Sequence, residues 1–192
     1  MLHTEIPRWI AKLDERKPYI EVLDGKKLPD VVTGHLHGQL VSRIATQLNA
    51  WAGDHGGVGV YVRFYFLHSN GKWSSLLPDV DYTSFARIPN SMADTSQRPR
   101  IAPDIAVDIL APGDRPEWTA RKIKTYLEFG ATVVVVLQPM NRTIRLHHAD
   151  GSVEEREARG AWTLAPFDDL VLDWENIYRG IGIAASAAAA RV

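Results

Sequence analysis

The chain contains no cysteine among its 192 residues. This absence excludes a disulfide scaffold, a zinc site with thiolate ligands and a cysteine nucleophile. Long apolar runs are also missing: the longest strongly apolar stretch, residues 131–137, is far shorter than the roughly 20 residues that cross a bilayer. Residues 1–20 carry charges throughout and lack the apolar core of a signal peptide. We therefore expect a cytoplasmic protein that is not bound to a membrane.

An excess of either charge is missing as well. The formal net charge is −1, from 22 basic and 23 acidic residues, so the overall basicity of a typical nucleic-acid-binding protein is absent. A contact with nucleic acid would then depend on a local basic patch or on metal ions. The composition is that of an ordinary globular protein, and the length predicts one domain, which we place at residues 1–180. We expect the alanine-rich residues 181–192 to form a disordered tail.

The spacing of apolar residues predicts a mixed α/β sheet. Helical spacing occurs in three segments, residues 6–17, 37–51 and 115–129. Strict alternation predicts one half-buried strand over residues 58–68, and the β-branched run at 132–137 predicts a central strand. The strand–helix–strand unit at 104–137 implies parallel neighbours, whereas turn signals at 24–25 and 150–151 imply antiparallel edges. The predicted architecture is a central mixed sheet flanked by helices.

Two acidic residues stand at unusual places in the predicted strands. Asp79 follows Pro78 at the start of a strand, and Asp81, two residues on, points to the same face. Asp108 lies within the apolar strand of residues 105–110. A carboxylate in such a strand costs several kcal/mol unless a metal ion, a cation or several backbone donors compensate for it. Backbone donors at a strand end are the structural alternative to a functional role.

Lys122 is the third candidate. A helical wheel over residues 115–129 places Lys122 in the apolar arc with Trp118 and Tyr126, and Lys124 on the opposite side. Such a lysine either extends along its aromatic neighbours to water or points across the sheet at the two aspartates. In the second case the chemistry is that of phosphodiester hydrolysis. The carboxylates bind Mg²⁺ or Mn²⁺, and the ammonium stabilises charge on the transition state.

Other polar residues invite weaker interpretations. His35 and His37 flank a helix start, where we expect capping or solvent-facing roles. Arg98, Arg100 and Arg115 could form a basic rim for phosphates beside the site, or an ordinary charged loop. The six tryptophans are scattered through the chain, and we expect most of them in the core.

The order and spacing of these residues resemble the PD-(D/E)XK nuclease superfamily. The chain is more closely similar to the bacterial Uma-two family, whose members are described as "putative restriction endonucleases". The resemblance covers about residues 19–179. It rests on five segments, namely residues 19–25, 37–38, 77–80, 103–112 and 122–126, the last followed by Gly130.

The resemblance implies a restriction-endonuclease-like fold and a DNA endonuclease that depends on Mg²⁺ or Mn²⁺. It implies that Asp79 and Asp108 bind the metal, that Lys122 is a catalytic lysine moved from the strand to the helix, and that Glu21 is a further catalytic acid. It also implies a homodimer, because nucleases of this superfamily often pair to cut both strands.

The chain departs from the family pattern at two positions, where Asp108 replaces the usual glutamate and Ala111 the usual serine. The shorter Asp108 side chain reduces the reach toward a metal. A catalytically inactive nucleic-acid-binding or interaction module on the same fold is therefore the alternative function. A hydrolase that uses the carboxylates on another substrate is a third possibility, for which no feature of the sequence is specific.

Overall fold

A six-stranded mixed sheet forms the centre of the computed structural model, which describes residues 5–17, 19–29, 31, 33–88 and 100–182. Strands β7 and β8 are parallel, and all other neighbours in this central sheet are antiparallel. The predicted mixed sheet is confirmed. Its strands, in spatial order, are β10 (Val153–Glu157), β9 (Thr143–His148), β8 (Val133–Gln138), β7 (Ile105–Ile109), β6 (Val80–Ser84) and β3 (Gly56–Val60).

A second, smaller sheet has four strands, in the order β2 (Lys26–Lys27), β1 (Val22–Leu23), β5 (Trp73–Leu76) and β4 (Phe64–Leu67). The single strand predicted over residues 58–68 is wrong, because the structure divides it into β3 and β4, which belong to different sheets. The break falls at Tyr61, whose φ of 54° turns the chain out of the extended conformation. Apolar residues alternate on both sides of the break, so the sequence pattern alone does not reveal it.

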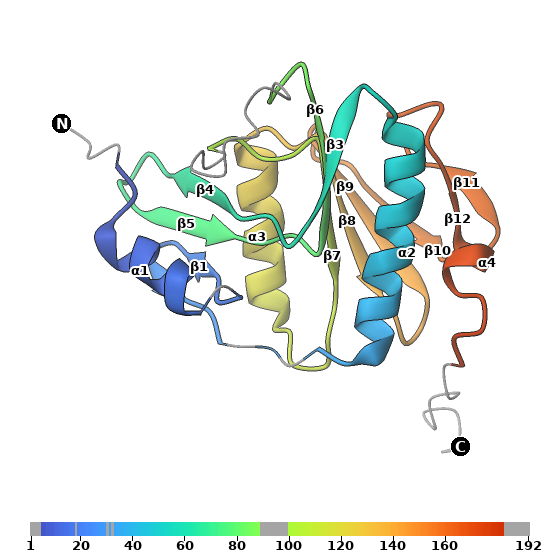
Figure 1. Ribbon diagram of the computed structural model, residues 1–192, viewed down its shortest axis with the longest axis horizontal. Helices are drawn as coiled ribbons and strands as arrows, with labels where there is room; N and C mark the ends of the chain where they lie inside the picture. The colour runs from blue at the N-terminus through green and yellow to red at the C-terminus, as the bar shows by residue number, and fades with distance from the viewer. Residues whose placement is uncertain (1–4, 18, 30, 32, 89–99, 183–192) are drawn as a thin grey trace.

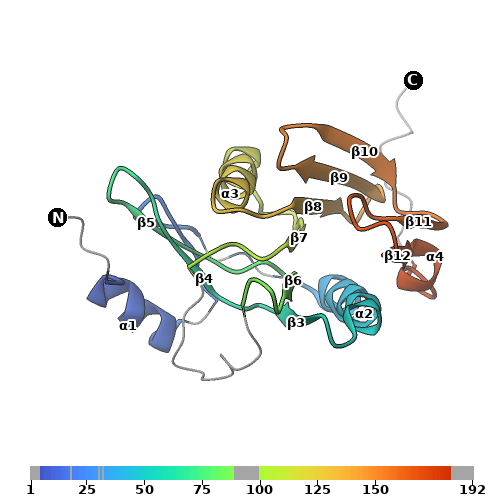
Figure 2. The same ribbon diagram turned by 90° about the horizontal axis from the view of Figure 1, so that it is seen from above.

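Helices cover both faces of the central sheet (Figures 1 and 2). On one face lie α2 (His35–Ala52) and α4 (Trp174–Ile177), next to a two-stranded ribbon of β11 (Ala161–Thr163) and β12 (Val171–Asp173). On the other face lie α3 (Pro116–Glu128) and the small sheet. Helix α1 (Arg8–Arg16) packs on the outer face of the small sheet. No helix in the part of the chain that the structure describes is long and apolar enough to span a membrane.

Strand β7 is buried on both faces, which decides where Asp108 points. Ile105, Val107 and Ile109 belong to the core beneath α2, and Ala106 belongs to the core beneath α3. Because side chains alternate along a strand, Asp108 shares the α3 face with Ala106. The apolar stripe of α3 that closes this core contains Ile123 and Tyr126.

Candidate active site

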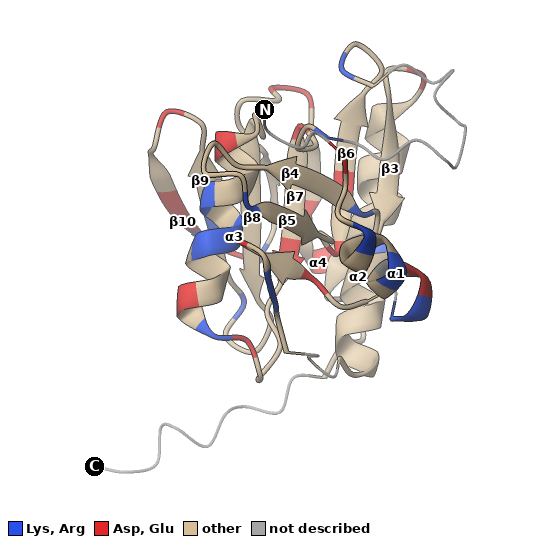
Figure 3. Ribbon diagram, turned by 90° about the vertical axis from the view of Figure 1, so that its left-hand side faces the viewer, with Lys and Arg blue, Asp and Glu red and all other residues tan. Residues whose placement is uncertain are grey.

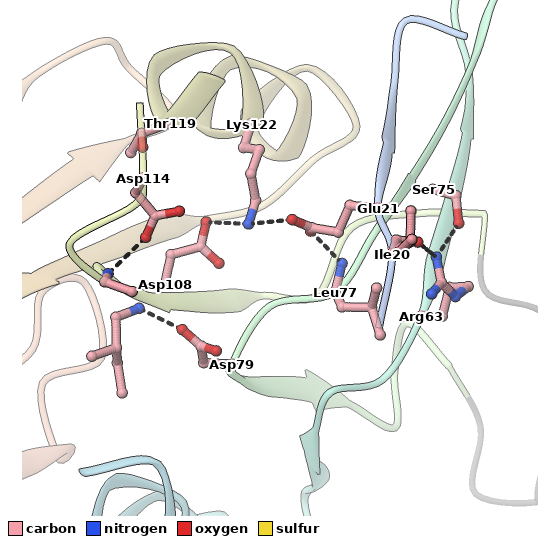
Figure 4. A network of polar contacts seen from close by, with 12 residues as sticks. Ile20, Glu21, Arg63, Ser75, Leu77, Asp79, Asp108, Asp114, Thr119 and Lys122 are labelled. Carbon is pink, nitrogen blue, oxygen red and sulfur yellow. Dashed lines mark hydrogen bonds and ion pairs between the residues drawn. The ribbon is translucent and has the colours of Figure 1, made fainter. Parts of the chain in front are cut away.

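The four residues that the sequence predicts as catalytic line one cavity of about 430 Å³. Glu21 comes from the segment before β1, Asp79 immediately precedes β6, Asp108 is in β7 and Lys122 is in α3. The cavity therefore lies where the small sheet, the central sheet and α3 meet. Figure 4 shows the four side chains approaching one another from these elements.

Asp79 and Asp108 are neighbours at one end of two adjacent inner strands of the central sheet, β6 and β7. The backbone N–H of Asp79 donates to the Val107 carbonyl at 2.9 Å, and the Asp79 carboxylate accepts from the Ile109 N–H at 2.6 Å. Val107 and Ile109 are the neighbours of Asp108 in β7, so Asp79 lies beside Asp108, and both carboxylates line the cavity. The exposed fraction is 15% for the Asp79 side chain and 6% for that of Asp108.

Lys122 joins the two sheets at this point. Its Nζ lies 3.1 Å from Oδ2 of Asp108 and 3.0 Å from Oε2 of Glu21. The other oxygen of Glu21 accepts a hydrogen bond from the Leu77 N–H at 2.7 Å. Of the two orientations considered for Lys122, the structure has the one that faces the sheet, whereas Lys124 is exposed. The catalytic role of Lys122 stays a prediction.

Burial and charge oppose each other in this cluster. Burial raises the pKa of Asp108 to about 7, because desolvation outweighs the attraction of Lys122, and the charges of Glu21 and Asp79 act in the same direction. Burial lowers the pKa of Lys122, but the charges of Asp108, Glu21 and Asp79 outweigh it and raise the pKa above its usual value. Lys122 is therefore a permanent cation, while Asp108 lacks full compensation for its charge.

The site has the donors that a hard divalent cation requires. Both oxygens of Asp108 are buried without a hydrogen bond of standard geometry. Among the described residues no group of three or more acidic or histidine side chains is arranged to enclose a metal. Mg²⁺ keeps several waters and is usually bound by one or two carboxylates together with substrate phosphates. Asp79 and Asp108 fit that pattern, with Glu21 as the next carboxylate of the cavity.

His37 belongs to this site, and the expectation of a capping or solvent-facing role for it is wrong. Its side chain is buried, with Nε2 3.1 Å from the Ile109 carbonyl and 3.3 Å from Oδ1 of Asp79. Burial lowers the pKa of His37, but the hydrogen bond and charge of Asp79 outweigh it and raise the pKa. The helical spacing of the apolar residues could have predicted this burial, because His37 precedes the buried Leu40 and Val41 by three and four residues. His35 is exposed, as expected.

Three aromatic residues that were not among the predicted site residues also line the cavity: Tyr19, Tyr61 and Trp118. The Tyr61 hydroxyl lies 3.4 Å from Nδ1 of His37, and burial together with the charge of Asp79 raises its pKa to about 12. The structure thus places an aromatic wall beside the carboxylates. No local pattern identifies Tyr61, because its position depends on the break between β3 and β4.

Of the three arginines expected to contact nucleic acid, the two that the structure describes lie against different tryptophans. The Arg115 guanidinium lies 4.5 Å from the ring centre of Trp118, at the edge of the cavity. Arg100 lies over Trp73, a residue packed with α1 on the outer face of the small sheet, and it does not line the cavity. Arg98 lies outside the described residues. A nucleic-acid role stays a prediction for all three.

The mixed central sheet, with helices on both faces and carboxylates at one end of its inner strands, is a restriction-endonuclease-like fold. A crystal structure described as "a putative nuclease belonging to DUF820" from Anabaena variabilis shares this architecture, with a TM-score of 0.75 and 21% sequence identity over 88% of this chain and 94% of that chain. The family model Uma2, described as "Putative restriction endonuclease", matches residues 4–183, and the chain belongs to this family. No curated protein matches the sequence.

Proposed function

We propose that the protein is a metal-dependent endonuclease that hydrolyses phosphodiester bonds in DNA. The observation that carries this proposal is the convergence of Asp79, Asp108 and Lys122 in one cavity from three separate elements. Two adjacent carboxylates and a permanent cation match the needs of phosphodiester hydrolysis, in which negative charge on the phosphate must be neutralised as water attacks. Membership of a family of this description supports the same function.

The carboxylates and the lysine have different roles in this scheme. Asp79 and Asp108 would hold Mg²⁺ or Mn²⁺, which would supply an acidified water and neutralise phosphate charge. Lys122 directs its ammonium at the scissile phosphate and stabilises the charge that grows on it. The orientation of the Asp79 carboxylate is fixed before any metal binds, because it accepts a hydrogen bond from the Ile109 N–H.

Glu21 acts through Lys122. Its two oxygens have different partners, the Lys122 ammonium and the Leu77 N–H, so the carboxylate connects the helix to the backbone of the small sheet. A lysine ammonium has three N–H donors, so Lys122 could keep Glu21 as its anchor and still donate to a phosphate oxygen.

The test is a cleavage assay on plasmid and single-stranded DNA with Mg²⁺ or Mn²⁺, using the wild type, Asp79→Ala and Asp108→Ala. We expect cleavage by the wild type and its loss in both variants. Calorimetry with Mn²⁺ gives a reading that does not depend on turnover, and binding should weaken in both variants. A wild type that cleaves nothing with either metal would establish the inactive-module alternative.

We also propose a homodimer located in the cytoplasm. The edge strand β3 supports association, because Val60 is 44% exposed there and the neighbouring Val62 is 36% exposed. An exposed apolar edge strand is a common place for chains to pair. Light scattering at micromolar concentration tests the proposal, and a monomer would exclude it.

A further inference from the structure

The mouth of the cavity is aromatic on two sides. Tyr19 is 70% exposed although it lines the cavity, and its ring stands edge-on to Tyr61 with ring centres 6.0 Å apart. Trp118 stands on α3, the element that also supplies Lys122. A large, exposed aromatic ring beside buried acidic groups is available to stack on a flat partner.

The charge of the cavity does not suit the backbone of a duplex. Its described lining has four carboxylates, from Glu21, Asp79, Asp108 and Asp114, against the single ammonium of Lys122. Duplex binding depends on many phosphate contacts from lysine and arginine. Figure 3 shows further lysine and arginine residues on α1 and α3, and of these only Lys122 lines the cavity.

The reacting groups are also recessed. The side chains of Asp108, Lys122 and Glu21 are 6%, 15% and 17% exposed, respectively. In a duplex the bases are stacked on one another, so the aromatic residues at the mouth of the cavity would contact only sugar and phosphate. An unpaired nucleotide presents a free base face to an aromatic side chain, and such stacking needs no particular sequence. A cavity of about 430 Å³ is within the usual range for a ligand of nucleotide size.

We infer that this cavity takes one unpaired nucleotide of single-stranded DNA, with the base against Tyr19 or Trp118 and the phosphate directed at Asp79, Asp108 and Lys122. Tyr61 supports the ring of Tyr19 from the side. The inference rests on the proposed function for DNA as the ligand, and it adds the strandedness of the substrate. An intact duplex is then a poor substrate, and a bulged or unpaired segment within a duplex is a good one.

The experiment measures binding by fluorescence anisotropy with one labelled oligonucleotide, used single-stranded, fully paired, or paired with a bulge. Ca²⁺ replaces Mg²⁺, and the integrity of the DNA is checked on a gel. We expect the single-stranded and bulged forms to bind at least tenfold more tightly than the duplex. Tyr19→Ala and Trp118→Ala should each weaken binding of the single strand about tenfold, the effect of losing one base–aromatic stack.

Three further variants control for trivial causes. Tyr19→Phe and Trp118→Phe keep a ring and should retain most of the binding, which separates stacking from a loss of stability. Trp9→Ala removes a ring that is 44% exposed on α1 and does not line the cavity, so it should bind like the wild type.

Equal affinity for duplex and single strand, or full binding by Tyr19→Ala and Trp118→Ala together, would overturn the inference. Cleavage of duplex DNA in that case would leave the proposed function intact. Conversely, tight binding of the single strand through Tyr19 and Trp118, without cleavage under any metal, would support the inference and remove the proposed enzyme.

Discussion

The imidazole of His37 lies 3.3 Å from the carboxylate of Asp79, although His37 is in α2 and Asp79 directly precedes β6 of the central sheet. Nε2 of His37 also lies 3.1 Å from the Ile109 carbonyl, while the Ile109 N–H donates to the other oxygen of Asp79. Both oxygens of Asp79 are thus held, one by the backbone of β7 and one by α2. A metal-binding carboxylate held in this way keeps its orientation.

The first prediction concerns this contact. His37→Leu removes the donor to Asp79 and should weaken Mn²⁺ binding by roughly 10–100-fold, as expected for the loss of an outer partner of a metal ligand. His37→Gln places an amide donor near the position of Nε2 and should recover much of the affinity. Calorimetry with Mn²⁺ measures both. His35→Gln, at an exposed position of the same helix, is the control. Equal Mn²⁺ affinity in all four proteins would show that His37 only fills space.

The second prediction separates the two lysines of α3. Lys122→Ala should reduce cleavage by roughly 10²–10³, the loss expected for one electrostatic contact to the transition state, and should leave metal binding largely intact. Lys124→Ala, at an exposed position, should cleave nearly like the wild type, with at most a slight loss of DNA affinity. Initial rates of plasmid cleavage measure the difference. Wild-type rates in both variants would assign Lys122 a structural role only.

The third prediction uses two glycines of β3. A methyl group on Gly59 would overlap with the buried carboxylate of Asp81 and the side chain of Val62, whereas one on Gly57 would meet only Phe85, at an ordinary 3.7 Å. Gly59→Ala should therefore lower the free energy of unfolding by about 1–3 kcal/mol. Gly57→Ala should be neutral or slightly stabilising, because alanine restricts the unfolded chain. Urea denaturation compares the two, and an equal effect of both changes would contradict the packing described for β6.

The fourth prediction concerns pH. The hydrogen bond from Arg121, 2.6 Å from Asp24, lowers the pKa of that carboxyl below its usual value. A lowered pKa in the folded state stabilises the protein above the unfolded pKa of 3.8, and this contribution is lost as the pH falls through the folded value. Asp24→Asn should therefore cost about 1 kcal/mol near neutral pH and much less in acid, a modest figure because the pair is partly exposed.

Asparagine suits this test because Asp24 has a φ of 50°, which asparagine also tolerates. Arg121→Met and the double variant complete a mutant cycle measured by urea denaturation at several pH values. A coupling between Asp24 and Arg121 that does not change with pH would refute the assignment.

Local periodicity predicted the helices well, because each has one strongly apolar stripe. The segments 6–17, 37–51 and 115–129 correspond to α1, α2 and α3. The same periodicity placed Lys122 on the sheet-facing side of α3. It failed at β3 and β4, because the alternation of apolar residues persists while the chain crosses from one sheet to the other at Tyr61.

The site was predictable in part. Asp79 and Asp108 could be placed together because the sequence predicts a strand at each of them, on either side of one loop; in the structure Asp108 is in β7 and Asp79 directly precedes β6. Glu21 was identified only through the family resemblance, because it precedes β1 of the small sheet and contacts Lys122, a residue far away in the sequence. Tyr19 and Tyr61 were missed for the same reason: their meeting is a tertiary contact without a local signature.

The division of the cavity between two sheets has a mechanical consequence. Asp79 and Asp108 are fixed to the same sheet, so a small rotation of one sheet against the other leaves their separation unchanged. Glu21 and Tyr19 precede β1 of the small sheet, and Lys122 contacts both Glu21 and Asp108. The two proposed metal ligands therefore share one framework, whereas the carboxylate that anchors Lys122 and the exposed ring of Tyr19 are attached to another, so a change in the small sheet can alter the position of the lysine without separating Asp79 from Asp108.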